Sequence, residues 1–524
     1  MIQVLEIENF KGIASRQRIE LAPLTLLFGA NSAGKSTVLQ ALLYLHELLE
    51  RGTADVDRTE LGGNVLELGG FARLVHRHEV NRAIVMRAEF ATPGSLERYG
   101  RDLTNFPFPD LDDEVESAWL ELTIRFRTTA AFRGPLVERA VIGVAGESEP
   151  LIWLETGTSL RDGEPLNVRV NLGHPLIAEA AQDATEVWEQ IAVPEKAPDQ
   201  ALEGEGGRPG SGSGLSNGSG FSDGRALPVF AVSRSRLSAL PPADEPLRVI
   251  AFGDDTEEKA AAAMQVRTFL EMVVLGTTAQ LLSSLRDALY IGPLRTIPPR
   301  GFLYERAGRL TSWGDGLAAW DLLLADRGSL VERTNHWLQR LGAGCQVVIQ
   351  QLFDGTAAAE ELSAGHVDKT VRRLLLDTGA GSLVLPSEVG AGVSQVMPVV
   401  VAALEGRGGL SLVEQPEIHV HPAVQVGLGD LYIDAVTRDG GRRTALVETH
   451  SEHLILRMLR RIRETTEKER SDNLPPFFPD MLSVLYVESH PEGVRIRRLR
   501  VDEHGEFVDR WPKGFFAERM KELL

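Results

Sequence analysis

The order of apolar and polar residues over the first 90 positions predicts strands that flank one buried helix. Residues 2–7 mix apolar and polar positions, as a half-buried strand does, and residues 24–28 form a continuous apolar run of strand length. Residues 37–45 have the apolar density of a buried helix, and residues 84–90 are a further strand candidate. The chain is therefore expected to begin as an α/β fold.

The same rhythm of strands and helices returns toward the C-terminus. Strands are predicted at residues 410–413, 445–447 and 483–487, helices at 399–404 and 453–463, and a hairpin at 494–508. The middle of the chain differs. It holds short strand-like runs at 119–126 and 140–144, helix-rich stretches at 257–290 and 316–341, and a Gly/Ser-rich segment at 203–225 that cannot bury a core.

The turn between the strand at 24–28 and the following helix carries a complete phosphate-binding loop. Residues 29–36 read Gly-Ala-Asn-Ser-Ala-Gly-Lys-Ser, which satisfies G-x-x-x-x-G-K-[ST] in the strand–turn–helix context that the motif needs. The helix start would hold the β-phosphate, Lys35 would reach the β- and γ-phosphates, and Ser36 would bind Mg²⁺. We therefore expect ATP and Mg²⁺ as ligands. The nucleotide-binding residues would be Gly29, Ala30, Asn31, Ser32, Ala33, Gly34, Lys35, Ser36 and Thr37.

Hydrolysis also needs a carboxylate for the metal and a group that positions water. The apolar run at 410–413 ends in Glu414, the Walker B pattern, so Glu414 joins Ser36 as a predicted metal ligand. Pro416 cannot continue a central strand, so the chain must turn at the sheet edge where ligands bind. We expect Gln415, Glu417 and His450 to organise water and to sense the γ-phosphate.

A second glycine-rich turn precedes the Walker B strand. Residues 390–395 read Gly-Ala-Gly-Val-Ser-Gln and lead directly into an apolar helix. Such a turn at a helix N-terminus makes an anion site. Ser394 and Gln395 are therefore candidate phosphate contacts.

Composition narrows the class of protein. The chain has 524 residues and a formal net charge of −19, so it offers no general electrostatic footprint for DNA. Its single cysteine, Cys345, excludes an internal disulfide framework and a cysteine-based zinc site. We find no apolar run of about 18 residues that would span a membrane and no signal peptide, and expect a cytoplasmic protein without a membrane partner.

Taken in order, these motifs resemble the ATP-binding-cassette (ABC) ATPases of the SMC and RecF class. Within this class of AAA-type P-loop proteins, the chain most resembles the overcoming-lysogenisation-defect (OLD)-like ATPases. Residues 9–12 are similar to that group's Asn-Phe-[Lys/Arg] opening, and residues 414–422 to its EQPE-h-H-h-HP box. Residues 290–295 and 511–516 are similar to marks of one bacterial branch with a small C-terminal domain of unknown function.

The resemblance implies a dimer in which ATP joins two heads. Phosphates held by residues 29–37 of one subunit would be capped by Ser394 and Gln395 of the other, and His450 matches the switch histidine. Many members of the wider group act in anti-phage defence, often beside a nuclease subunit. The wider group has Asp-Glu where this chain has Glu414-Gln415. Since glutamine is a poor base, either Glu417 takes that role or hydrolysis is slow.

The expected fold is thus an α/β P-loop NTPase of the ABC head type, with a split nucleotide-binding domain and an inserted α+β or helical middle region. The expected segments are a first head part at 1–90, an insertion at 91–280, a helical or connecting region at 281–370, a second head part at 371–470 and a small C-terminal domain at 471–524.

Three functions fit these expectations. The first is an Mg²⁺-dependent ATPase that forms a homodimer or higher oligomer and controls an effector such as a nuclease, in anti-phage defence. The second is a DNA repair or recombination clamp of the RecF or SMC type, with DNA as a partner. The third is a scaffold that binds ATP with little turnover.

Overall fold

The computed structural model describes most of the chain and divides it into two compact units. The described residues are 1–59, 66–92, 115–147, 149–161, 163–178, 188–189, 191–193, 227–251, 256–300, 312–326, 329–352, 371–405, 409–438, 443–469 and 474–511. The first unit combines Met1–Leu48, Val56–Met86 and Leu282–Leu524, and the second combines Leu49–Asp55 with Arg87–Leu281. The Gly/Ser-rich segment at 203–225 lies outside the described residues.

A six-stranded sheet organises the first unit. Its order is β13-β17-β18-β3-β19-β20. Its strands are β13 (Leu289–Ile291), β17 (Leu410–Glu414), β18 (Thr444–Glu448), β3 (Leu24–Gly29), β19 (Leu482–His490) and β20 (Gly493–Leu499). All neighbours pair in parallel except the β19–β20 hairpin. Every residue of β3 is buried, as expected of a parallel strand covered on both faces.

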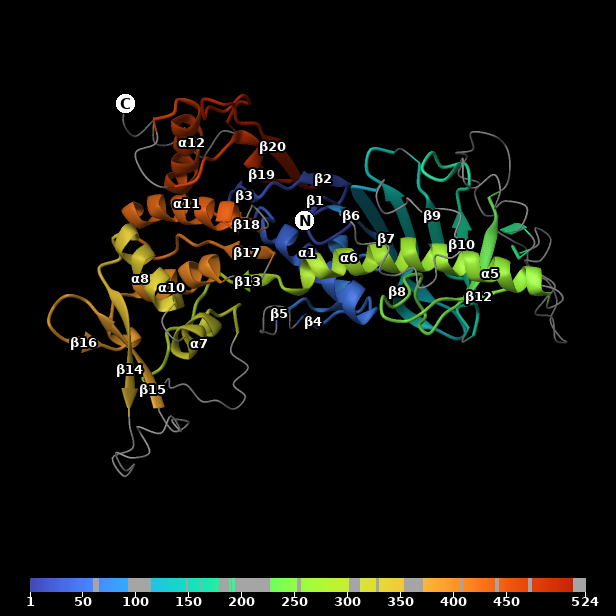
Figure 1. The fold of residues 1–524 in the computed structure, drawn as a ribbon, viewed down its shortest axis with the longest axis horizontal. Helices are drawn as coiled ribbons and strands as arrows, with labels where there is room; N and C mark the ends of the chain where they lie inside the picture. The colour runs from blue at the N-terminus through green and yellow to red at the C-terminus, as the bar shows by residue number, and fades with distance from the viewer. Residues whose placement is uncertain are drawn as a thin grey trace. The chain divides into compact units, whose positions relative to one another are not determined.

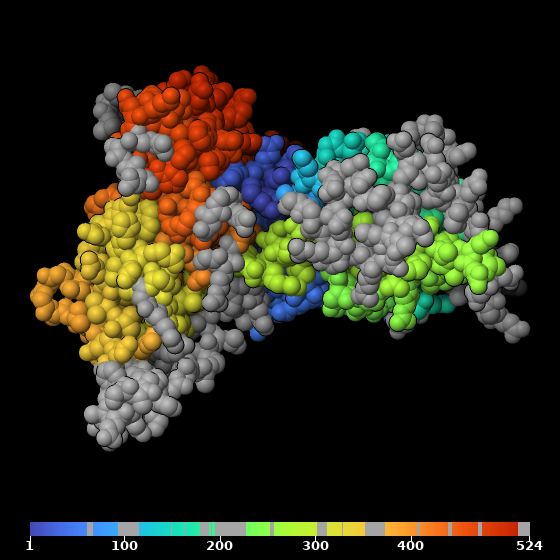
Figure 2. All heavy atoms as spheres, viewed as in Figure 1, coloured from blue at the N-terminus to red at the C-terminus, as the bar shows by residue number. Residues whose placement is uncertain are grey.

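The first unit also contains helices α1 (Ser36–Arg51), α2 (Gly70–Leu74), α7 (Leu317–Ala325), α8 (Ser329–Leu341), α10 (Ala391–Leu404), α11 (Pro422–Thr437) and α12 (Glu452–Thr466). Residues of α7, α8, α10, α11 and α12 share one hydrophobic core with the sheet. α10 packs on β13 and β17, α11 packs on β18 and β3, and α8 packs on both helices. The core joins Leu24 and Phe28 of β3 to Trp320 and Trp337. In Figure 2, α12, β19 and β20 gather in one block (red) on the face in view.

Smaller antiparallel pieces complete the first unit. They are the pair β1 (Ile2–Glu8) and β2 (Gln17–Glu20), the pair β4 (Arg58–Thr59) and β5 (Leu66–Glu67), and the sheet β14 (Gln346–Leu352), β15 (Val371–Asp377) and β16 (Leu383–Val384). β14 and β15 lie beside α8 and α7 (Figure 1). Residues 281–370 were expected to be helical or connecting, so β14 was not predicted.

The second unit is an antiparallel sheet with a long helix. The strands follow the chain in the order β6-β7-β8-β9-β10-β11-β12. They are β6 (Ile84–Ala91), which begins in the first unit, β7 (Ser117–Thr128), β8 (Arg133–Val144), β9 (Ile152–Glu155), β10 (Leu166–Val170), β11 (Val229–Ser233) and β12 (Arg248–Ile250). The helix α5 (Glu257–Leu270) contacts β12, and Trp188 packs between Phe230 of the sheet and Phe269 of α5.

The residues from Glu257 to Arg286 form one continuous helical run. α5 passes through a π-helical turn (Glu271–Leu275) into α6 (Gly276–Arg286). The run is long and apolar enough to cross a membrane by length and composition, but 78% of its most apolar window is buried. Such burial is typical of a core helix. The helix-rich character predicted for residues 257–290 is confirmed, whereas an apolar stretch of this length was not expected.

The expected fold class is confirmed. The parallel sheet with the phosphate-binding loop at the end of β3, the return of the chain to that sheet after residue 282 and the inserted unit from Arg87 to Leu281 match an α/β P-loop fold with a split nucleotide-binding domain. The predicted strands at 24–28, 410–413 and 445–447 are β3, β17 and β18.

Candidate functional site

The phosphate-binding loop connects β3 to α1 with a backbone that requires glycine. Gly29 has a φ of 153°, and a Cβ there would lie 2.1 Å from the Val487 carbonyl oxygen. Gly34 has a φ of 98°. Ala30, Asn31 and Ser32 are exposed at the tip, and α1 begins at Ser36. The loop thus presents the first N–H groups of α1 at the edge of the sheet, as an anion cradle does.

Lys35 is held inside this loop. Its side chain is buried, and its Nζ donates to the carbonyl oxygens of Gly29 and Ala30. It also lies 3.7 Å from Glu448 Oε1. Burial lowers the pKa of Lys35, and Glu448 opposes that effect. The Lys35 side chain therefore lies at the base of the loop, within reach of a phosphate that the loop would bind.

Two carboxylates lie beside Ser36. Glu414 ends β17 and Glu448 ends β18, and the two residues face each other in the parallel register. The Ser36 hydroxyl lies 2.6 Å from Glu448 Oε2 and 3.4 Å from Glu414 Oε2. Tyr290 of β13 donates its hydroxyl to Glu414 Oε1 at 2.9 Å. Burial raises the pKa of Glu414, and the charge of Glu448 raises that pKa further.

These side chains suit the cation that a phosphate-binding loop implies. Mg²⁺ prefers oxygen ligands and is commonly held by one or two carboxylates together with substrate phosphates. Ser36 and Glu414 were predicted from the sequence, whereas Glu448 was not. A signal for Glu448 was present, because the apolar run at 445–447 ends in a glutamate just as the Walker B run does.

Glu417 is anchored to the end of β18. Its Oε2 accepts from the Thr449 hydroxyl at 2.8 Å, and its Oε1 accepts from the His450 backbone N–H at 2.6 Å. Burial raises the pKa of Glu417, although these hydrogen bonds oppose the rise. The carboxylate therefore fixes the segment that carries His450.

Gln415 begins the turn that was predicted from the presence of Pro416. Its φ is 44°, a left-handed value, and its N–H donates to the Glu448 carbonyl oxygen at 2.7 Å. His450 is half-buried, and its Nε2 is buried without a hydrogen-bond partner. Burial and the charge of Lys35 lower the pKa of His450. A neutral histidine with an unpaired ring nitrogen thus lies close to the cradle.

Ser394 and Gln395 lie inside the fold. Ser394 is fully buried and donates to the Pro386 carbonyl oxygen at 3.1 Å. The Gln395 side chain bonds to the backbone N–H and carbonyl of Arg295, whose guanidinium donates to the Glu414 and Gln415 carbonyls. Both side chains therefore make contacts within the fold of this chain. The exposed residues at the start of α10 are Gly390 and Ala391.

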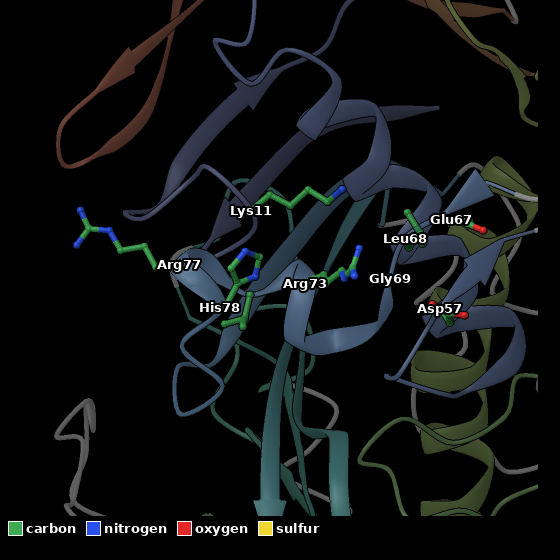
Figure 3. Close-up of a pocket in the computed structure, with 9 residues that line it drawn as sticks. Lys11, Asp57, Glu67, Leu68, Gly69, Arg73, Arg77 and His78 are labelled. Atoms are coloured by element: carbon green, nitrogen blue, oxygen red, sulfur yellow. The ribbon is translucent and has the colours of Figure 1, made fainter.

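A cavity of about 840 Å³ opens beside the same helix α1. It is lined by Lys11, Asp57, Glu67, Leu68, Gly69, Arg73, Val75, Arg77 and His78. The Lys11 Nζ donates to Gln40 of α1, one turn after Ser36. Figure 3 shows Lys11 and Arg73 reaching toward Leu68 and Gly69, with Asp57 and Glu67 beyond them, whereas Arg77 points away. The cavity is polar and carries cations on the side of the phosphate-binding helix.

The chain can be compared with curated proteins, solved structures and protein families. No curated protein matches the chain. Solved structures with low similarity include "Crystal structure of the SmcHead bound to the C-winged helix domain of ScpA", with 9% identity, a TM-score of 0.38 and coverage of 96% of this chain and 98% of that chain. An Smc head domain from Pyrococcus furiosus bound to the C-terminal domain of ScpA has 10% identity, a TM-score of 0.37 and coverage of 100% and 98%.

An SMC head domain from Thermotoga maritima has 9% identity, a TM-score of 0.35 and coverage of 95% and 99%. Similarity at this level carries no information about activity.

The match to a protein family is more direct. Residues 1–90, which include the phosphate-binding loop and α1, match the family described as AAA ATPase domain.

Proposed function

We propose that this protein is an Mg²⁺-dependent ATPase of the ABC class whose nucleotide state controls a partner protein. The observation that carries the proposal is the convergence of Lys35, Ser36, Glu414 and His450 at the carboxyl ends of β3, β17 and β18. A lysine, a hydroxyl, a carboxylate and an unpaired histidine in this order are the parts that phosphoryl transfer to water uses.

Each side chain has a distinct task in the proposed reaction. The α1 N–H groups and Lys35 hold the phosphates, while Ser36 and Glu414 hold the metal. Bound Mg²⁺ neutralises charge on the β- and γ-phosphates. Water attacks the γ-phosphorus, the bond to the bridging oxygen of ADP breaks, and inorganic phosphate leaves. The unpaired Nε2 of His450 is free to contact the γ-phosphate.

Glu417 is the proposed organiser of the attacking water. Gln415 can orient water but cannot take its proton effectively. Glu417 is a nearby carboxylate whose raised pKa favours proton uptake. Its hydrogen bonds to Thr449 and His450 would transmit the state of the γ-phosphate to the Walker B turn.

The cavity beside Lys11 is the proposed place for the rest of the nucleotide. Lys11 and Arg73 offer cations to the α-phosphate, and Asp57 and Glu67 offer acceptors to ribose or base. Arg73→Ala should weaken binding of a fluorescent ATP analogue several-fold, whereas Arg463→Ala on the exposed side of α12 should not. Equal affinities of Arg73→Ala and Arg463→Ala for the analogue would mean that this cavity does not bind the nucleotide.

Steady-state ATP hydrolysis tests the central proposal. Wild type should release phosphate, and Lys35→Ala should not, because the variant loses the charge that holds the γ-phosphate. Turnover that is equal in both proteins would sink the proposal. Retained ATP without turnover in the wild type would favour the scaffold, for which the occupied oxygens of Glu417 and the Walker B Gln415 are the specific support.

The biological role is proposed from the sequence resemblance alone. We place the protein in anti-phage defence, as a cytoplasmic homodimer joined through ATP that controls a nuclease or another effector. Purification from phage-challenged cells with a nuclease bound in an ATP-dependent way would support this role. DNA-stimulated hydrolysis without such a partner would favour the repair clamp instead.

A further inference from the structure

The end of β18 carries a buried carboxylate to which the motif assignments give no task. Glu448 is 4% exposed and lies at the centre of the sheet edge, with β17 on one side and β3 on the other. Its strand partner is Glu414, the Walker B carboxylate. The parallel register therefore places two glutamates at equivalent positions, both facing the phosphate-binding loop.

The Glu448 side chain contacts two residues of the phosphate-binding loop, Lys35 and Ser36. Oε2 accepts from the Ser36 hydroxyl at 2.6 Å, which is shorter than the 3.4 Å from Ser36 to Glu414. Oε1 lies 3.7 Å from Lys35 Nζ. Ser36 is thus bound more closely by Glu448 than by the Walker B residue.

We infer that Glu448 is a second carboxylate of the divalent-cation site and acts there with Glu414 and Ser36. This inference rests on the proposed ATPase function. Two carboxylates and a hydroxyl, completed by substrate phosphates, are a donor set that Mg²⁺ and Mn²⁺ accept. Two buried glutamates that face each other are costly without a cation to share, because their like charges repel.

A purely structural role makes a different prediction. If Glu448 only accepted a hydrogen bond from Ser36, Glu448→Gln would replace it well, since the amide oxygen is an equivalent acceptor. If Glu448 holds the cation, the same variant removes one negative charge from the site and weakens the metal. The substitution therefore separates charge from hydrogen bonding.

The test measures Mn²⁺ binding by electron paramagnetic resonance of the free ion, in the presence of a non-hydrolysable ATP analogue. Glu448→Gln should weaken Mn²⁺ about 10- to 100-fold, the usual effect of altering a metal site. Affinity for the analogue in EDTA should stay within a few-fold of wild type. Glu332→Gln, an exposed glutamate of α8, is the matched control.

The outcomes of this test separate the Glu448 inference from the ATPase proposal. Unchanged Mn²⁺ affinity in Glu448→Gln overturns the inference while leaving the ATPase proposal intact. Failure of the wild type to bind the analogue overturns both. If Glu448→Gln does not fold, Glu448→Asp keeps the charge but withdraws it by one methylene. It should bind Mn²⁺ more weakly than wild type, and wild-type affinity in Glu448→Asp would overturn the inference.

Discussion

At the residue scale, most of the charged and hydroxyl groups of the candidate site could be predicted from sequence motifs, and one carboxylate, Glu448, could not. Lys35, Ser36 and Glu414 could be predicted because their motifs fix both spacing and context. The run at 445–447 also ends in a glutamate, but the position of Glu448 beside Glu414 could not be predicted, because it depends on β17 and β18 being adjacent and in register. Ser394 is the opposite case. Its motif predicted a phosphate contact, but the motif does not indicate that the hydroxyl donates to the Pro386 carbonyl oxygen inside the fold.

The role of Glu417 leads to a kinetic prediction. Glu417→Gln should lower kcat by about 10²-fold or more with little change in KM, because a general base acts in the transition state. The measurement is phosphate release as a function of ATP concentration, with Glu332→Gln as the control. A normal kcat would remove Glu417 from the chemistry and leave it as an anchor for His450.

Gly29 leads to a prediction about stability. Gly29→Ala would press a methyl group against the Val487 carbonyl oxygen at a φ of 153°, so the loop and β19 must separate. Overpacking of this kind costs about 1–3 kcal/mol. Gly379→Ala, with a positive φ but nothing within 4 Å of its Cβ, isolates the backbone contribution. Thermal unfolding should show the larger loss at Gly29, and equal losses would contradict the close approach.

At the scale of elements, a buried ion network joins α11 to α12. Asp430 accepts from Arg457 and Arg461, with the closest distance 2.7 Å, and its side chain is nearly buried. The helix at 453–463 was predicted from its pattern, whereas this partnership was not, because charges on one helix do not reveal which neighbour they meet.

This network predicts a specific acid sensitivity. Burial alone would raise the pKa of Asp430, but the hydrogen bonds from Arg461 and Arg457 outweigh it and lower the pKa below the ordinary value. A depressed folded-state pKa stabilises the protein above the unfolded pKa of about 3.9. That contribution is lost as the pH falls from about 4 through the folded-state pKa.

The variant Asp430→Asn tests this network. It should lower the free energy of unfolding by about 3–5 kcal/mol at pH 7, because it removes the buried carboxylate that Arg457 and Arg461 share, although Arg461 keeps its pair with Glu464. Its stability should also depend less on pH below about 4 than that of the wild type. Asp434→Asn, which removes a more exposed pair with Arg438 on the same helix, should cost less than about 1 kcal/mol. Urea unfolding at pH 7 and at a pH below about 4 measures the free energy of unfolding of each variant. Equal losses of stability in Asp430→Asn and Asp434→Asn would count against the network.

At the scale of the whole molecule, the split arrangement was predictable because the P-loop and the Walker B pattern stand at opposite ends of the chain. They must meet in one sheet for either to be useful, and β3 and β17 do lie in one sheet with β18 between them. The antiparallel sheet of the second unit was harder to predict. Its strands are short runs without motifs, so periodicity marks their existence but not their pairing.

The exposed start of α10 leads to the prediction at this scale. If two copies close on ATP, each must present an anion-binding surface to the other's phosphates. Gly390 and Ala391 are exposed at the N-terminus of α10, where the helix dipole favours a phosphate, while Ser394 and Gln395 are held inside. The backbone at this helix start would therefore make the contact first assigned to those two side chains.

Sedimentation velocity with ATP and Mg²⁺ would detect such closure. In the Glu417→Gln background, which should retain ATP, monomers are expected to become dimers, and Lys35→Ala should remain monomeric. Ala391→Tyr in the same background should bind a fluorescent ATP analogue normally yet fail to dimerise, because the ring covers the helix start. A bulky residue at another exposed helix start, Glu257→Tyr on α5, should dimerise as the background does. Dimers that form equally well with Ala391→Tyr would mean that two copies meet through another surface.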